Sequence, residues 1–224
     1  MSISVAIDGP SGAGKSTLAK RLAGELGYVY VDTGAMYRAI GLYTLRQGKD
    51  PKDAAAVEAL LPQINMEAKP APGGQQMLLN GEDVTAEVRR EEVGMAASAV
   101  SAHPAVRAFL LEKQREMARS QNVLMDGRDI GTVVLPDATV KIFLTAAAEA
   151  RAQRRMKELV EKGQPKSFEA VLADVLQRDL QDSTRAAAPL KQAEDAIRLD
   201  TTYLDFDESF ERMKEIILRR AGLL

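Results

Sequence analysis

The sequence predicts an α/β fold in which helices flank a central parallel β-sheet. Short apolar runs that suit strands alternate with segments of helical period, and this alternation is typical of parallel sheets. Polar turns follow these runs, at Asp8, Asp32, Asp126 and Thr145. Because ligands of such sheets gather at the carboxyl ends of the strands, these turns predict the functional edge.

Most of the chain can be divided into such elements. The first strand is expected at the apolar run with Ile3, Val5 and Ile7, and further strands are expected at 28–31, 123–125, 140–144 and 196–199. Leucines at spacings of four predict a helix over 16–27, and apolar periodicity predicts others over 35–47, 88–100 and 104–120. A C-terminal helix should present one apolar face, with Phe210, Met213 and Ile217. We therefore expect a parallel sheet of five strands.

Two segments interrupt the alternation. Residues 63–85 contain the turn-rich stretch 70–74 and the dipeptide Asn80-Gly81, a hairpin signal, and we interpret them as a small antiparallel β insertion. Residues 149–185 begin with a basic helix over 149–162, which a Gly163-Gln164-Pro165 break separates from a second amphipathic helix with Phe168 at its start. We interpret this helical pair as a mobile lid. Residues 1–62, 86–148 and 186–224 would form the core of a single domain over 1–224.

Composition excludes several classes of function. Thirty basic and thirty-two acidic residues leave a net charge of -2, which does not suggest a nucleic-acid polymer as partner. The absence of cysteine excludes disulfides, thiolate zinc sites and cysteine nucleophiles. Neither a secretion signal nor an apolar run of about 18 residues is found, so we expect no membrane span and a cytoplasmic protein.

The strongest motif lies between the first strand and the first helix. Residues 9–16, GPSGAGKS, match G-x-x-x-x-G-K-[ST], whose glycines let backbone N–H groups surround phosphate oxygens above a helix N-terminus. Lys15 should reach the β- and γ-phosphates of a nucleotide, and the Ser16 hydroxyl should bind magnesium. The predicted ATP-binding residues are Gly9, Pro10, Ser11, Gly12, Ala13, Gly14, Lys15, Ser16 and Thr17.

Asp126 ends the apolar run 123–125, where a second residue that holds Mg²⁺ is expected in proteins with this loop. An ordinary turn before Gly127 is the structural alternative. We predict a magnesium site formed by Ser16 and Asp126, with ATP as co-substrate.

Arginines near the predicted strand ends distinguish a kinase of small molecules from other proteins with this loop. Two anionic substrates must be held together while charge spreads over the transferred group, and arginines meet that need. The candidates are Arg38, Arg107, Arg128, Arg178 and Arg185. Each alone is more typical of a solvated surface position than of a binding site, so the argument depends on their association with aspartates and turns.

Four segments together resemble bacterial cytidylate kinases. They read DGPSGAGKS at 8–16, DTGAMYR at 32–38, DGRDIGT at 126–132, and Arg178-Asp179 with Asp182, Arg185 and Ala188-Pro189-Leu190. The resemblance extends from Ile3 to about Asp200, and the insertion resembles the monophosphate-binding insertion of longer members. It implies transfer of the ATP γ-phosphoryl group to CMP or dCMP by a monomer.

The resemblance also implies roles for individual residues. Thr33, Arg107 and Asp129 would face cytosine, Arg38, Arg128 and Arg185 would clamp the CMP phosphate, and Ser98, Arg178 and Asp182 would contact the sugar. Lys15, Arg128 and Arg185 would be catalytic. A carboxylate at Asp129 suits the N4 amine of cytosine and opposes O4 of uracil, and Arg107 suits the ring acceptors.

Other functions remain open on the sequence alone. Another P-loop kinase would act on UMP or a different acceptor, and a non-catalytic nucleotide-dependent switch would signal through a partner. A guanine-specific switch needs N-K-x-D, which does not occur here, whereas a motor ATPase with a partner's arginine is not excluded. His103, before Pro104, suits a cap or turn, and Tyr37 suits the pocket and the core equally.

Overall fold

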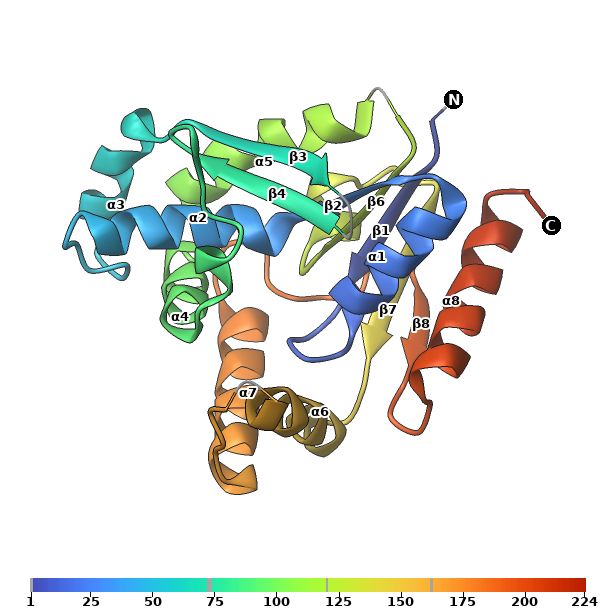
Figure 1. Ribbon diagram of the computed structural model, residues 1–224. Helices are drawn as coiled ribbons and strands as arrows, with labels where there is room; N and C mark the ends of the chain where they lie inside the picture. Colours follow the sequence, from blue (N-terminus) through green and yellow to red (C-terminus); the bar gives the residue numbers. More distant parts are fainter. Residues whose placement is uncertain (1, 72–73, 120, 162) are drawn as a thin grey trace.

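The computed structural model describes residues 2–71, 74–119, 121–161 and 163–224, and a five-stranded sheet lies at its centre (Figure 1). The strand order is β2-β6-β1-β7-β8, and every neighbouring pair is parallel. This confirms the predicted sheet. The strands are β1 (Ser4–Asp8), β2 (Val29–Asp32), β6 (Val123–Gly127), β7 (Val140–Thr145) and β8 (Ile197–Asp200).

Helices cover both faces of the sheet. On one face, α1 (Lys15–Leu26) and α8 (Phe206–Arg220) pack their apolar sides on β1 and β7 around Leu22, Phe210 and Ile142. On the other, α5 (Pro104–Arg119) and a π-helix (Ile130–Val134) enclose a smaller cluster with Met125. Because neighbouring strands are parallel, the polar turns that follow them lie at one edge of the sheet.

Two predicted helices begin more than one residue away from their predicted start. Helix α2 (Thr33–Arg46) starts two residues before the predicted position, because the Asp32 carboxylate accepts a hydrogen bond from the Ala35 N–H at 2.9 Å and caps it. The single helix expected over 88–100 is a 3-10 helix (Glu87–Arg89) followed by α4 (Glu91–Val100). Arg90 breaks it with an extended backbone, ψ 149°.

The insertion forms the predicted antiparallel sheet, with β3 (Met66–Ala71), β4 (Gly74–Leu79) and β5 (Glu82–Asp83). Asn80 and Gly81 both have positive φ, 50° and 85°, as a tight two-residue hairpin requires. Its apolar face packs on α2. The helices before it, α3 (Ala54–Leu60) and a 3-10 helix (Leu61–Gln63), were not predicted. Residues 72 and 73 of the predicted turn lie outside the described residues.

The helical pair after β7 also matches the prediction. Helices α6 (Ala148–Glu161) and α7 (Phe168–Thr184) pack on each other through a cluster of their own, with Ala152, Leu159 and Val171. The pair projects away from the sheet (Figure 1). The predicted end of the first helix, residue 162, lies outside the described residues. In the described part of the chain, every helix is too short or too polar to cross a membrane.

Candidate active site

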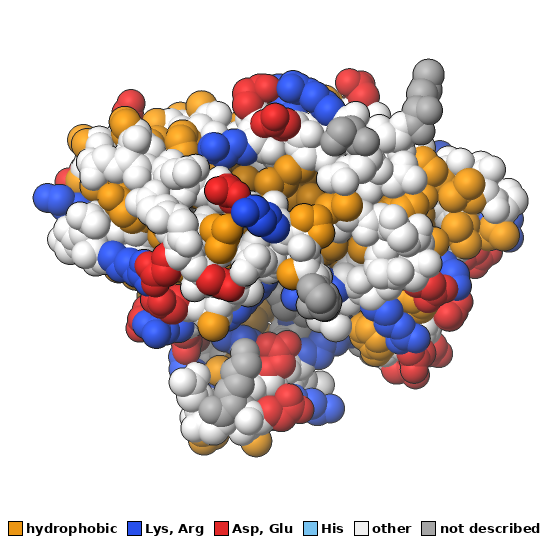
Figure 2. All heavy atoms as spheres, turned by 45° about the horizontal axis from the view of Figure 1, so that its top comes forward, with side chains coloured by type: hydrophobic (Ala, Val, Ile, Leu, Met, Phe, Trp, Pro, Cys, Tyr) orange, Lys and Arg blue, Asp and Glu red, His pale blue; other side chains and the backbone are white. Residues whose placement is uncertain are grey.

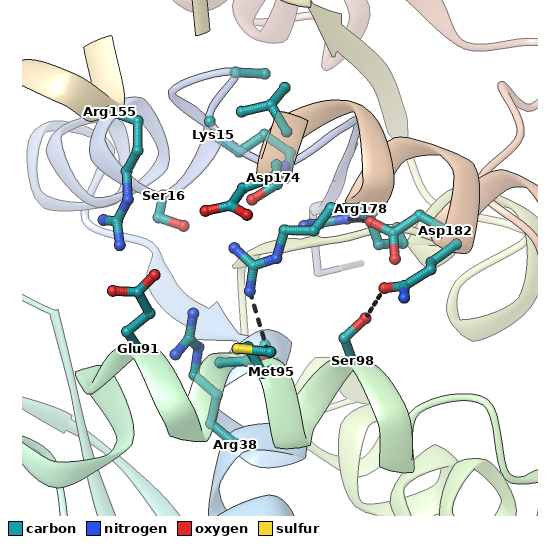
Figure 3. A pocket seen from close by; sticks show the side chains of 18 of the residues that line it. Lys15, Ser16, Arg38, Glu91, Met95, Ser98, Arg155, Asp174, Arg178 and Asp182 are labelled. Atoms are coloured by element: carbon teal, nitrogen blue, oxygen red, sulfur yellow. Dashed lines mark hydrogen bonds and ion pairs between the residues drawn. The ribbon is translucent and has the colours of Figure 1, made fainter. Parts of the chain in front are cut away.

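The carboxyl ends of the strands open into a cavity of about 1490 Å³, between the phosphate loop, α4 and the α6–α7 pair. Basic side chains enter it from several elements, and Figure 3 shows Arg38, Arg155 and Arg178 extending into it from three helices. Of the predicted site residues, the following line it: residues 11–17, Arg38, Ser98, Asp126, Arg128, Arg178, Asp182 and Arg185. A concave, strongly basic space beside a phosphate loop suits anionic ligands.

The phosphate loop connects β1 directly to α1, as the motif predicts. Gly9 has φ 151°, and a Cβ there would lie 1.9 Å from the Leu144 carbonyl oxygen of β7, so no other residue fits. The Lys15 ammonium donates a hydrogen bond to the Pro10 carbonyl at 2.8 Å, and the residue is 5% exposed. Burial, together with the charge of Arg128, lowers the pKa of Lys15 to about 7.

Asp126 lies beside the loop and is almost fully buried. The Ser16 hydroxyl donates to its Oδ2 at 2.8 Å, and the Tyr30 hydroxyl donates to its Oδ1 at 2.8 Å. Burial raises the pKa of Asp126 to about 6, and the charge of Asp32 on the neighbouring strand adds to this. The predicted metal ligands are therefore adjacent.

This donor set fits magnesium. The described residues contain no group of three or more His, Asp and Glu side chains arranged to hold a metal ion. Magnesium usually keeps several waters and takes only one or two protein oxygens besides substrate phosphates. The two hard oxygen donors, Ser16 Oγ and Asp126 Oδ2, meet that requirement.

The residues predicted to face the base form a buried group next to the cavity. Asp129 accepts hydrogen bonds from Arg107 and, at 3.4 Å, from Arg185 Nη2. The Arg107 guanidinium lies over the Tyr37 ring, 5.7 Å from its centroid, and the Thr33 hydroxyl donates to the Asp126 carbonyl at 2.8 Å. Thr33, Arg107 and Asp129 are not among the residues that line the cavity, and Arg185 connects them to it.

The side chains predicted to hold the acceptor phosphate and sugar each form a hydrogen bond or an ion pair with another protein group. Arg38 donates to the Val88 carbonyl at 3.0 Å, and Arg178 donates to the Gly94 carbonyl at 3.1 Å. Burial, with the nearby charge of Arg178, lowers the pKa of Arg38 to about 10. Arg128 pairs with Asp182 at 2.7 Å, and Ser98, whose dashed contact is seen in Figure 3, donates to Gln181 at 3.1 Å.

Several residues at the site had no assigned role in the sequence. Arg89 forms an ion pair with Asp32 at 2.6 Å and lines the cavity. The Gln75 side-chain amide pairs with the backbone N–H and carbonyl of Asp32, at 3.0 and 3.3 Å, and so attaches the insertion to β2. Asp32 was conspicuous at a strand end, but no local signal identified its partners.

Arg151 lies in the segment predicted as a lid, but its side chain turns inward. It is 4% exposed, donates to the Ser11 carbonyl at 3.0 Å and pairs with both carboxylate oxygens of Asp179. It thereby ties the helical pair to the phosphate loop. His103 lies directly before α5, and its Nε2 is 2.8 Å from the Pro51 carbonyl oxygen. This contact agrees with a structural role.

A loop of this kind beside a basic cavity supports phosphoryl transfer between two bound anions. The fold and the site together define a P-loop kinase that acts on small molecules.

Comparison with known proteins narrows this class. The family model described as cytidylate kinase matches residues 5–219. A cytidylate kinase of Geobacillus kaustophilus (strain HTA426) is 50% identical over 220 residues, 98% of this chain and 98% of that protein. One of Caldicellulosiruptor saccharolyticus (strain ATCC 43494 / DSM 8903 / Tp8T 6331) is 48% identical, over 98% and 97%. This chain belongs to the cytidylate kinase family, as the sequence motifs indicated.

Solved structures resemble the chain more distantly. A gluconokinase from Sinorhizobium meliloti 1021 aligns with a TM-score of 0.49 at 13% identity, over 98% of this chain and 94% of that one. The strand order β2-β6-β1-β7-β8 of this chain itself defines the fold.

Proposed function

We propose that this chain transfers the γ-phosphoryl group of ATP to CMP or dCMP, giving ADP and CDP or dCDP. One observation carries the proposal: a single cavity joins the phosphate loop to Arg38, Arg128, Arg178 and Arg185. Both substrates carry phosphates, so a donor site and an acceptor site must share one basic space. Membership of the cytidylate kinase family supports the choice of acceptor.

The chemistry needs no covalent intermediate. A phosphate oxygen of the acceptor attacks the γ-phosphorus directly, and catalysis consists of positioning and charge stabilisation. Lys15 would leave the Pro10 carbonyl and bind the β- and γ-phosphates, while Arg128 and Arg185 would neutralise charge between donor and acceptor. Ser16 and Asp126 would hold Mg²⁺, which when bound offsets phosphate charge.

The acceptor would replace contacts that the protein now makes with itself. Arg38, Arg128 and Arg185 would exchange their carbonyl and carboxylate partners for the CMP phosphate, and planar guanidinium groups hold such oxygens bidentately. Ser98, Arg178 and Asp182, on facing helices α4 and α7, would contact the sugar.

Cytosine would be recognised by Thr33, Arg107 and Asp129. A carboxylate has roughly four acceptor positions, and among the described residues Arg107 and Arg185 are the side chains that donate to Asp129. The remaining capacity suits the N4 amine, which uracil lacks. Because these residues do not line the cavity, this role requires the neighbouring side chains to move when the acceptor enters.

We further propose that residues 149–185 act as a lid and 63–85 as a monophosphate-binding insertion on the single domain. Lys166, between α6 and α7, already forms an ion pair with Glu91 of α4 at 2.6 Å, and both residues line the cavity. Closure of such a helical pair excludes water from the transferred group.

On the face shown in Figure 2, basic and acidic side chains are interspersed, which supports small-molecule partners over a nucleic-acid polymer. A monomer is proposed from the family resemblance.

The Asp129→Ala variant tests the choice of acceptor. A hydrogen bond with a charged partner is worth about 1.5–3 kcal/mol, so kcat/KM for CMP should fall roughly 10- to 150-fold. For UMP, whose O4 the carboxylate opposes, it should change little or rise. If Asp129 only orders Arg107 and Arg185, both substrates should lose by a similar factor, and the base-recognition role would be wrong.

A further inference from the structure

We propose that Asp8, the last residue of β1, is a positioning residue for acceptor recognition: it caps the π-helix and thereby leaves the Asp129 carboxylate available to Arg107, Arg185 and the base. The inference rests on the proposed function of Asp129. It assigns a role on the acceptor side to a residue that adjoins the ATP-binding loop.

The geometry around Asp8 is specific. The residue is 4% exposed, and both oxygens of its carboxylate are used: Oδ1 accepts from the Ile130 N–H and Oδ2 from the Gly131 N–H, each at 2.7 Å. Strands β1 and β6 are parallel neighbours, with Asp8 opposite Gly127. The side chain therefore reaches the residues that follow β6 directly.

Asp129 occupies the position at which an aspartate would itself cap this helix. Such a residue normally accepts a hydrogen bond from one of the first N–H groups of the helix. The Asp129 side chain makes no such bond, and its two oxygens accept from Arg107 and Arg185 instead. Asp8 takes over the capping function from across the sheet.

Loss of the Asp8 carboxylate would leave two buried N–H groups without a hydrogen-bond partner. Unsatisfied buried donors are costly, and short aspartate side chains readily bond nearby backbone N–H groups. The Asp129 carboxylate is the acceptor next to them in sequence, so it would turn towards them and away from the two arginines. Acceptor recognition would weaken although Asp8 does not line the cavity.

Asp8 also lies close enough to Lys15 for their charges to interact. A variant at Asp8 therefore has two routes to lower activity. The Lys15 route would affect reactions with CMP and UMP equally, because ATP is common to both. The Asp129 route would change the ratio of kcat/KM for CMP to kcat/KM for UMP, so this ratio is the readout.

The test is Asp8→Asn, which keeps one acceptor oxygen and turns an N–H donor towards an N–H. The CMP to UMP ratio should fall about tenfold, the effect of about 1.4 kcal/mol, and the KM for CMP should rise more than that for ATP. In an Asp129→Ala background, Asp8→Asn should leave the ratio unchanged. Asp53→Asn, at the cap of α3 far from this group in sequence, is the control and should leave the ratio unchanged.

The outcomes separate the inference from the proposed function. Suppose that Asp129→Ala changes the CMP to UMP ratio. An unchanged ratio in Asp8→Asn, or an equal fall in the wild-type and Asp129→Ala backgrounds, would then overturn the inference alone. An unchanged ratio in Asp129→Ala would overturn the base-recognition role, and the inference with it.

A second variant keeps the test possible if Asp8→Asn does not fold. In Gly131→Ala the new Cβ would lie 3.3 Å from Asp8 Oδ2 and 3.2 Å from Lys141 Cδ, so it presses on the carboxylate without removing it. The ratio should fall by about two- to fivefold, because one hydrogen bond is weakened rather than lost. A folded Gly131→Ala protein with an unchanged ratio would contradict the inference.

Discussion

The ATP side and the acceptor side of the cavity are built in different ways. The ATP side is one continuous segment, residues 9–17, whose backbone geometry is fixed by positions such as Gly9 against Leu144. The acceptor side is assembled from α2, α4, α5, α7 and the turn after β6. Some of its side chains are held by each other, as in the pairs Arg128–Asp182 and Arg107–Asp129, and others, such as Arg38 and Arg178, are held by backbone carbonyls.

This difference separates two ways of preparing a site for phosphate. A loop of backbone N–H groups is ready before a ligand arrives and needs little reorganisation. A cluster of paired arginines and carboxylates must exchange partners when its ligand binds, and this makes binding selective. We therefore expect single changes on the ATP side to abolish turnover, and changes on the acceptor side to act on substrate choice and KM.

The largest effect is expected for Lys15→Ala. Electrostatic contacts to a transferred phosphoryl group are usually worth roughly 10²-fold or more, so kcat should fall by at least that factor with little change in circular dichroism. The exposed Lys49→Ala is the control and should retain its activity. Retention of more than about a tenth of kcat in Lys15→Ala would contradict the role.

The acceptor-side counterpart is Arg128→Ala. It removes a proposed clamp on the CMP phosphate and leaves Asp182 without its ion-pair partner, so kcat/KM for CMP should fall roughly 10- to 100-fold. The KM for ATP, measured at saturating CMP, should change less. Equal changes in the KM for ATP and the KM for CMP would mean that Arg128 serves the ATP side and the acceptor side alike, which would contradict this prediction.

A pH series sharpens the description of the ATP side. Since burial lowers the pKa of Lys15 to about 7 in the free protein, ATP must bind to the protonated form, and its affinity should decrease as pH rises. Between pH 7 and 8 the expected loss is about fivefold for a single group of this pKa, with proton uptake on binding. Calorimetry in buffers of different ionisation enthalpy measures both. Absence of proton uptake at pH 8 would be inconsistent with a depressed pKa.

The smallest effect concerns stability. Burial raises the pKa of Asp8 to about 6, above its unfolded value. The folded protein therefore binds the proton more tightly, and this contribution to stability is present at low pH and lost as pH rises through about 6. The difference in free energy of unfolding between the wild type and Asp8→Asn should change in favour of the wild type by roughly 1–3 kcal/mol from pH 7 to pH 4. A difference that is independent of pH would show that the pKa of Asp8 is not raised.

The same contrast explains what the sequence could predict. The phosphate loop and the Asn80–Gly81 turn are each one continuous stretch of sequence, and the conformation of each depends on its own residues. Both were therefore predicted at the correct positions. Asp32 and Gln75 are 43 residues apart and meet only after the insertion folds onto β2. Tyr30 had the appearance of an ordinary core residue, and its hydroxyl contact with Asp126 leaves no local pattern.

Two further differences have the same origin. Arg151 was grouped with a lid because its helix is basic, but a long side chain near a helix start can turn inward, and it contacts Ser11. The break at Arg90 follows no proline or glycine. The carbonyls of Arg90 and of Val88, two residues before it, accept hydrogen bonds from Arg38, about fifty residues away. Tertiary contacts of this kind override helical periodicity.

ADP formation by the wild-type protein, with ATP, magnesium and one nucleoside monophosphate at a time, tests the central claim most directly. If the basic cavity is a kinase site for cytidine monophosphates, kcat/KM should be highest for CMP or dCMP and much lower for UMP and AMP. ADP release should be slow without an acceptor. Equal or faster reaction with UMP, or ADP formation that does not depend on any monophosphate, would contradict the account.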